Sequence, residues 1–202
     1  NGVLAALITS IVILAASIYI LNGFSSKTIC AIIGTSTGII ISGGLAMIAG
    51  SMSHLNGFNM TDVESMIYIA NNSKLHVSDI LYAGILISSL GAVMDVSVSI
   101  VAAITEIHEK APHLKAKELF MSGMHVGHDM MGTMSNTLIL AYTGSATGTL
   151  LTIYSYEMLY LQLMGYNSII IEIVCGLCGT IGVILTVPIQ AFITTMVLKV
   201  RR

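Results

Sequence analysis

The chain has 202 residues, of which 55% are hydrophobic and only 9% are charged, and its mean hydropathy is +0.90. Soluble domains carry about 25% charged residues, so this composition cannot cover a water-facing surface and predicts a protein whose main solvent is lipid. The net charge of −2 excludes a basic footprint for nucleic acid. We therefore expect the lipid bilayer, and no nucleic acid, among its partners.

The first quarter of the chain predicts two membrane-spanning helices. Crossing a bilayer takes about 20 mostly apolar residues, and residues 3–21 and 28–52 each supply such a run without a charged side chain. Gly34 and Gly38 in the second run form a small-xxx-small pair, which lets another helix approach closely. The polar stretch that follows contains Thr-Asp-Val-Glu at residues 61–64, typical of a capping box, and predicts a short surface helix from about residue 62.

The rest of the chain predicts further long helices. A third span is expected over residues 80–107, and a less apolar helix from about Lys115 to about Tyr142. Residues 149–166 are apolar and could be a spanning, short or interfacial helix. The last span is expected over residues 169–198, where Pro188 predicts a kink.

Clusters of basic residues indicate the topology, because Lys and Arg in short loops favour the cytoplasm. Lys27, the three lysines at 110–117 and the C-terminal cluster share one side only if residues 115–198 cross an even number of times. This favours five crossings plus an interfacial or re-entrant helix, whereas six would place Arg201 and Arg202 outside. We therefore expect an all-α, polytopic transmembrane helix bundle of about five to six spans with a short interfacial helix. It forms a single transmembrane domain over residues 1–202, which an N-terminal extension can precede.

One polar stripe is predicted on the third span. Ionisable residues within spans are costly, usually face the bundle interior and are functional candidates. Asp95 lies about midway along its apolar run, and small or polar residues recur around it every three or four positions. The stripe consists of Ser88, Gly91, Asp95, Ser99, Ala102 and Glu106. It can line a polar path or meet another helix, and Asp95 can alternatively be a hydrogen-bonded packing carboxyl.

A second polar stripe is predicted on the next helix, within residues 121–137. His125, Asp129, Gly132 and Asn136 share one face, with His128 and Ser135 at its edge, a set that could bind a cation or relay a proton. The alternative is that His125 and Asp129 form an i,i+4 pair that fixes the helix entry. Thr133, Ser135, Ser97 and Ser99 are more often contacts between helices than ligands.

Other residues give weaker signals. The six methionines near these stripes favour flexible packing over a soft-metal site, and the sequence leaves a metal site undetermined. Cys175 and Cys178 lie among glycines on the last span, where cysteine acts as a small residue at a close helix contact; a disulfide framework is not expected. Glu172 is a third candidate carboxyl within the membrane. No cofactor is expected.

Two long motifs carry a family resemblance. Residues 91–100 (GAVMDVSVSI), followed by Glu106-Ile107, and residues 118–124 and 127–142 (GHDMMGTMSNTLILAY) resemble the signature of the YibE/F-like membrane proteins. The closing helix, residues 179–188, is similar too. The resemblance implies a bacterial, multi-pass plasma-membrane protein that can pair with a related subunit. His128 departs from the pattern, where arginine is more usual before the aspartate. The family supplies no established activity.

The residues are compatible with three functions. The leading one is transport of a small ion or solute, with Asp95 as the central cation or proton site. In this scheme Glu106 forms the mouth, Ser99 and Thr133 line the path, and His125, His128, Asp129 and Asn136 form a cytoplasmic-side gate or second site. The alternative is a non-catalytic membrane subunit that forms a homo-oligomer, or a heteromer with a related membrane subunit. An intramembrane metalloenzyme ranks lowest, because no nucleophile motif accompanies the histidines, and we expect no enzymatic activity.

Overall fold

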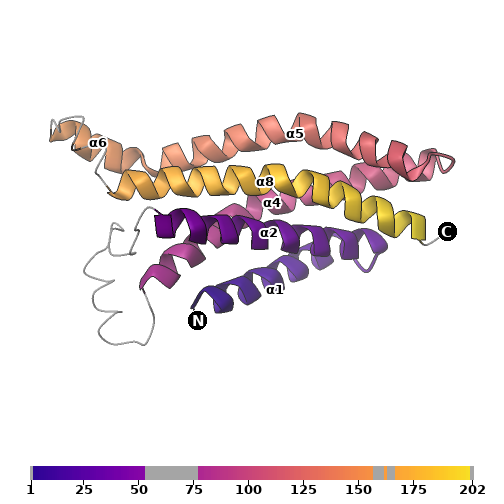
Figure 1. The fold of residues 1–202 in the computed structure, drawn as a ribbon, viewed down its shortest axis with the longest axis horizontal. Helices are drawn as coiled ribbons and strands as arrows, with labels where there is room; N and C mark the ends of the chain where they lie inside the picture. The colour runs from indigo at the N-terminus through magenta and orange to yellow at the C-terminus, as the bar shows by residue number, and fades with distance from the viewer. Residues whose placement is uncertain (1, 53–76, 157–161, 163–166, 201–202) are drawn as a thin grey trace.

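The structure, a computed structural model, describes residues 2–52, 77–156, 162 and 167–200. These residues form α-helices, and no strand occurs among them. The helices run side by side as an elongated bundle (Figure 1). Their bounds are α1 Gly2–Asn22, α2 Ser26–Met52, α4 Val77–Lys110, α5 Ala116–Ser145, α6 Thr147–Ser155 and α8 Asn167–Val200.

Helices α4 and α8 form the centre of the bundle. Helix α8 packs against α2, α4 and α5, and α4 contacts all four other long helices. Helix α1 lies at one edge against α2 and α4, while α5 lies at the other edge against α4 and α8 (Figure 1). The two polar stripes predicted from the sequence therefore lie on neighbouring helices, α4 and α5.

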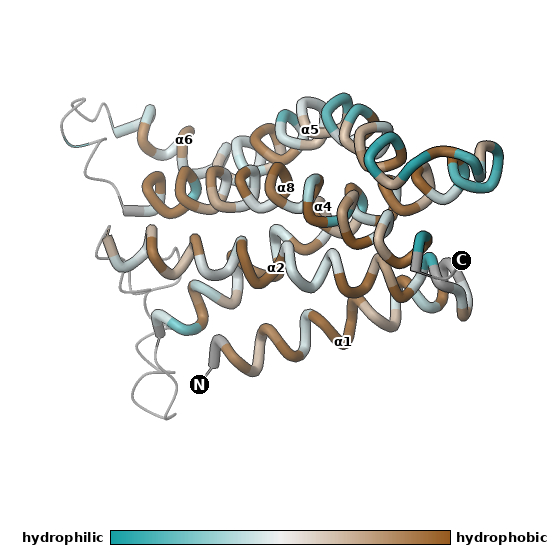
Figure 2. The backbone as a smooth tube through the Cα atoms, turned by 45° about the vertical axis from the view of Figure 1, so that its right-hand side comes forward, coloured by the Kyte–Doolittle hydropathy of each residue, from teal (hydrophilic) through white to brown (hydrophobic). Residues whose placement is uncertain are grey.

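The buried core runs between these helices. Its main cluster includes Leu14 of α1, Ile39 of α2, Val93 and Ile100 of α4 and Val187 of α8, all completely buried. Apolar side chains also cover much of the outside of the bundle, and brown, hydrophobic segments extend along its helices in Figure 2. A bundle that is apolar both inside and outside is suited to lipid rather than to water.

Glycines set the close approach of α2 to α8. A Cβ atom at Gly34 would overlap the Gln190 side chain, and one at Gly38 would overlap Thr186 and Val93. The predicted small-xxx-small contact is therefore confirmed. Gln190, fully buried, donates from Nε2 to the Cys30 carbonyl oxygen across the two helices at 3.0 Å.

Three helices are long and apolar enough to cross a membrane: Lys27–Met52, Ser78–Lys110 and Ser168–Lys199. Helix α1 contributes a shorter apolar segment, Leu4–Ile20, among the described residues. Helix α5 has 30 residues but is more polar, and α6, with nine residues, is about 14 Å long and too short to span. Five or six crossings thus go beyond the three that composition and length support.

The predicted surface helix, the Pro188 kink and the helix bounds can be compared with the structure. The surface helix from residue 62 lies outside the described residues, as does most of the segment after Tyr156. Pro188 lies within α8, whose helix is continuous from Asn167 to Val200. The long helices otherwise begin and end within about three residues of the predicted positions.

Candidate functional site on the polar face of α4 and α5

The polar stripe of α4 faces away from the bundle. Asp95 is exposed, whereas Val93, Val96 and Ile100 on the opposite side of the helix are completely buried. The exposed stripe comprises Gly84, Ser88, Gly91, Asp95, Ala102 and Glu106, with Ser99 half-buried. Sequence reasoning expected such a carboxyl to face the bundle interior. Within a single chain it does not, because the core positions of α4 are taken by its aliphatic residues.

The polar residues of α5 are exposed as well. Its buried side is made of Leu119, Gly123, Gly127 and Leu138, and the two glycines let α5 settle against Ile104, Ile100 and Val187. The opposite side carries His125, His128, Asp129, Thr133 and Asn136, all exposed. The four residues predicted to share this face, His125, Asp129, Gly132 and Asn136, are exposed, while Ser135 at its edge is half-buried.

The charges on α5 interact only weakly with one another. His128 Nδ1 lies 4.0 Å from Asp129 Oδ1, with side-chain exposures of 84% and 89%. No hydrogen bond is shown between them, and an exposed pair at this distance contributes little stability. Both groups are left available to a ligand or to another chain.

Contacts between the two helices place Asp95 and Asp129 at similar depth. Helices α4 and α5 are antiparallel, since Ile104 meets Gly123 and Ile100 meets Gly127, and the Ser88 and Tyr142 hydroxyls are 2.7 Å apart. This register puts Asp95 level with residues 132–135 of α5. Asp129 is then three to six residues from that level, or about 5–9 Å along the axis.

Asp95 is also near the middle of a candidate membrane span. It follows Val77 by 18 residues and precedes Lys110 by 15 on α4, and the span covers Ser78–Lys110. A carboxylate at such a depth that faced hydrocarbon would cost about 2.5–3.5 kcal/mol on insertion scales. The face that holds Asp95 is therefore unsuited to lipid.

The basic end of the bundle is built as the charge pattern predicted. Lys27 pairs with Glu109 at 3.2 Å, which brings the start of α2 to the end of α4. Lys199 donates to the Leu114 carbonyl oxygen at 2.6 Å, which brings the end of α8 there too. Glu106 is exposed at the same end and pairs with Lys110 at 2.8 Å. The lysine groups thus gather at one end of the bundle.

Several polar residues of the interior escaped sequence reasoning. Gln190, Thr186 and Thr194 are completely buried on α8, and Gln190 and Thr186 are each an isolated polar residue within an apolar run. The Ser88–Tyr142 contact was also missed, since it depends on the register of two helices. For Gln190, the sequence signal is a polar amide side chain between apolar neighbours.

Cysteines and metal ligands are dispersed in the described part of the chain. Cys30, Cys175 and Cys178 are buried, in keeping with a role as small packing residues. No three His, Cys, Asp or Glu side chains among the described residues are grouped so that they could hold a metal ion.

Comparison with known proteins identifies the family to which the chain belongs. No curated protein and no solved structure matches the chain. A family model described as "YibE/F-like protein" matches residues 1–200, which is nearly the entire chain and includes both polar stripes. The chain therefore belongs to the YibE/F-like family.

Proposed function

We propose that this chain is a non-enzymatic subunit of an oligomeric membrane transporter for a small ion or solute. The path would run along the polar face of α4 and α5, where subunits meet. One observation carries the proposal: Asp95 is exposed on the outside of the single-chain bundle, midway along an apolar helix. Since lipid is a poor solvent for a carboxylate, a polar path between chains is its natural surrounding.

The arrangement suits a cation or a proton. Asp95 is the central site, with Ser99 one turn further along α4 and Thr133 on the exposed side of α5 as neutral oxygen donors. Asp129, one to two turns away along the bundle axis, supplies a second carboxylate. His125 and His128 can accept or donate protons, and the Asn136 amide can accept and donate hydrogen bonds. Glu106 lies at the basic end, where it forms the mouth.

The partner in this proposal is a second copy or a related membrane subunit. Gly84 and Gly91 interrupt the exposed stripe of α4, and a Cβ atom at either would meet nothing within 4 Å in the single chain. Small residues on an exposed helix face let another helix approach closely. The face thus combines space for a neighbouring backbone with polar groups that need covering.

We also propose five crossings, α1, α2, α4, α5 and α8, with the lysine-rich end in the cytoplasm of a bacterial cell. The gathering of Lys27, Lys110 and Lys199 at one end supports this topology. It explains why α5, although polar on one face, is as long as a span: that face would be covered by the neighbouring subunit.

Flux into proteoliposomes tests the function. The assay screens protons and monovalent and divalent cations with the purified protein, its Asp95→Asn variant and an Asp79→Asn control. The control makes the same chemical change in the first turn of α4, far from the proposed path. We expect Asp95→Asn to reduce flux at least tenfold and Asp79→Asn to keep it. Equal flux through all three proteins would remove Asp95 from the path.

The second candidate is a non-catalytic membrane subunit whose polar face only binds a partner. The exposed small residues of α4 favour it, because they are as suitable for helix packing as for a path. In that case Asp95→Asn would lower the assembled fraction, with no flux attributable to the wild type. The mass of the detergent-solubilised complex, measured alongside flux, separates the two functions.

A further inference from the structure

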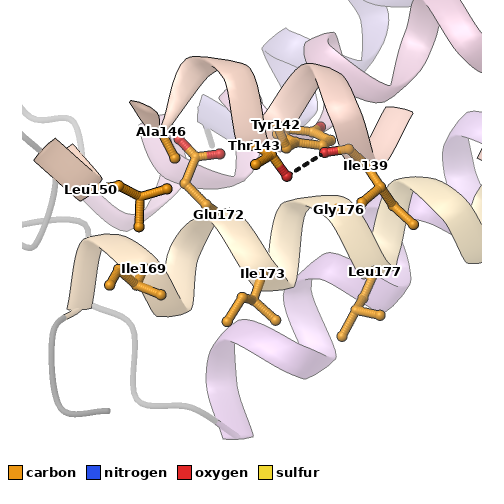
Figure 3. Close-up of a pocket in the computed structure, with 10 residues that line it drawn as sticks. All are labelled: Ile139, Tyr142, Thr143, Ala146, Leu150, Ile169, Glu172, Ile173, Gly176 and Leu177. Atoms are coloured by element: carbon orange, nitrogen blue, oxygen red, sulfur yellow. Dashed lines mark hydrogen bonds between the residues drawn. The ribbon is translucent and has the colours of Figure 1, made fainter. Parts of the chain in front are cut away.

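A cavity lies at the end of the bundle opposite the lysines, between α5, α6 and α8 (Figure 3). It has a volume of about 300 Å³, within the range of small-molecule sites. A second cavity of about 380 Å³ lies on the α4 side, and both are lined by Tyr142 and Glu172. The same tyrosine and carboxylate are therefore accessible from two hollows.

The first cavity is almost entirely apolar. Ile139 and Leu150 line it from the α5–α6 side, and Ile173 and Leu177 line it from α8. Figure 3 shows the Glu172 carboxylate pointing from α8 toward α5, beside Ala146. An apolar hollow with one acidic group recognises a ligand that has a hydrophobic body and one positive charge.

The carboxylate has no cationic partner within the described lining. Neither cavity is lined by a Lys, Arg or His among the residues the structure describes. Ser145, near this carboxylate, donates its hydroxyl proton to the Tyr142 carbonyl oxygen at 2.8 Å. Glu172 lies in the second turn of α8, inside the candidate span Ser168–Lys199. A counter-charge beside this carboxylate would stabilise its ionised form.

Tyr142 adds a second element of recognition. Its hydroxyl is held by Ser88 of α4 at 2.7 Å, so the ring is fixed at the boundary of the two cavities. The face of an aromatic ring attracts a cation, most strongly where water is excluded. A fixed ring and a carboxylate on adjacent helices can therefore act on the same positive group.

We propose that this cavity binds a lipophilic organic cation, with Glu172 as its counter-charge and the Tyr142 ring as an apolar and cation–π contact. A bare metal ion is a poorer occupant, because one carboxylate amid aliphatic side chains cannot replace its oxygen ligands. An organic anion is repelled by Glu172. The inference does not depend on the proposed transport along the α4–α5 face.

Equilibrium binding of tetraphenylphosphonium to the purified full chain in nanodiscs tests the site, with empty nanodiscs subtracted. Tetraphenylborate, which has a similar shape and the opposite charge, is the matched ligand control. We expect saturable binding of the cation at least tenfold tighter than binding of the anion. Equal affinity for the two ions would show partition into apolar surface and would overturn the proposal. This comparison uses the wild type and is independent of variant folding.

Two variants then locate the site. Glu172→Gln should weaken cation binding at least tenfold, whereas Glu109→Gln, at the opposite end of the bundle, should leave it unchanged. Gly176→Leu should abolish binding by filling the cavity that Gly176 lines. Cation affinity retained in both Glu172→Gln and Gly176→Leu would place the binding elsewhere and refute the assignment.

Discussion

A close approach of α2 to α8 at Gly182 gives a prediction that can be worked out from the structure. Gly182 of α8 faces Ser42 of α2, and a Cβ atom there would lie 2.7 Å from the Ser42 Cβ and 3.5 Å from its Cα. Ordinary carbon contacts are about 3.5–4.0 Å. Because the Ser42 Cβ does not move when the side chain changes rotamer, the Gly182→Ala substitution forces the helices apart by roughly 1 Å.

The expected cost follows from two opposing effects. Over-packing of this kind costs about 1–3 kcal/mol, while alanine in a helix gains about 0.5–1 kcal/mol over glycine. The net expectation is a loss of up to about 2.5 kcal/mol for Gly182→Ala. Gly176→Ala is the matched control on the same helix, because its Cβ would meet only a Tyr142 ring carbon at an ordinary 3.6 Å.

Reversible unfolding in mixed micelles provides the assay. Gly176→Ala should be as stable as the wild type or slightly more stable, and Gly182→Ala should unfold at lower denaturant. The reasoning is refuted if Gly182→Ala is at least as stable as Gly176→Ala. Such a result would mean that α2 and α8 do not meet at Gly182 and Ser42.

Three further predictions concern the interior. Gln190→Leu should change the free energy of unfolding by less than about 1.5 kcal/mol, because the lost bonds to Cys30 and Thr194 are offset by removing an unpartnered buried oxygen. Gln190→Ala also leaves a void and should cost more, about 2–4 kcal/mol. Equal losses of stability for the two variants in unfolding titrations would contradict this. A double-mutant cycle with Ser88→Ala and Tyr142→Phe should show a coupling of about 0.5–1.5 kcal/mol, and strict additivity would mean that the 2.7 Å contact is not formed. Buried Cys175 should resist a maleimide in the folded protein and react after denaturation, as followed by mass spectrometry; rapid labelling of the native protein would contradict its burial.

The helices were predictable because their signal is local. Long apolar runs bounded by Asn22-Gly23, Lys110 and Pro112 define where a helix can begin and end, and the structure places the long helices within about three residues of those positions. The position of the lysine groups at one end of the bundle was likewise predictable, since their shared preference for one side of a membrane constrains distant parts of the chain. Their meeting at one end follows from Lys27–Glu109 and Lys199–Leu114.

The direction of the polar stripes was not predictable. The helical spacing of the residues and the composition place Asp95 and Ser99 on one face of α4. The same pattern arises whether that face lines an internal path or meets another chain. The distinction depends on which face the other helices cover. That is decided by the glycines of α5 and by the aliphatic side of α4, and so by packing between segments far apart in sequence.

The Glu172 cavity also depends on tertiary arrangement. The sequence singled out Glu172 as a carboxyl within the membrane, but its neighbours come from α5, α6 and α8. Tyr142 is 30 residues away along the chain. Only the antiparallel packing of α5 and α8 brings the ring, the carboxylate and the aliphatic wall together.

Cross-linking between copies tests most directly whether the α4 stripe meets another subunit. The experiment uses chains whose native cysteines are replaced by alanine and that carry one cysteine, either Gly91→Cys on the stripe or Phe192→Cys on the exposed side of α8. After mild oxidation in native membranes, the stripe variant should form disulfide-linked dimers and the α8 variant should stay monomeric. Dimers from the α8 variant alone would show that Asp95 does not lie at an interface between copies, and would contradict the proposed path.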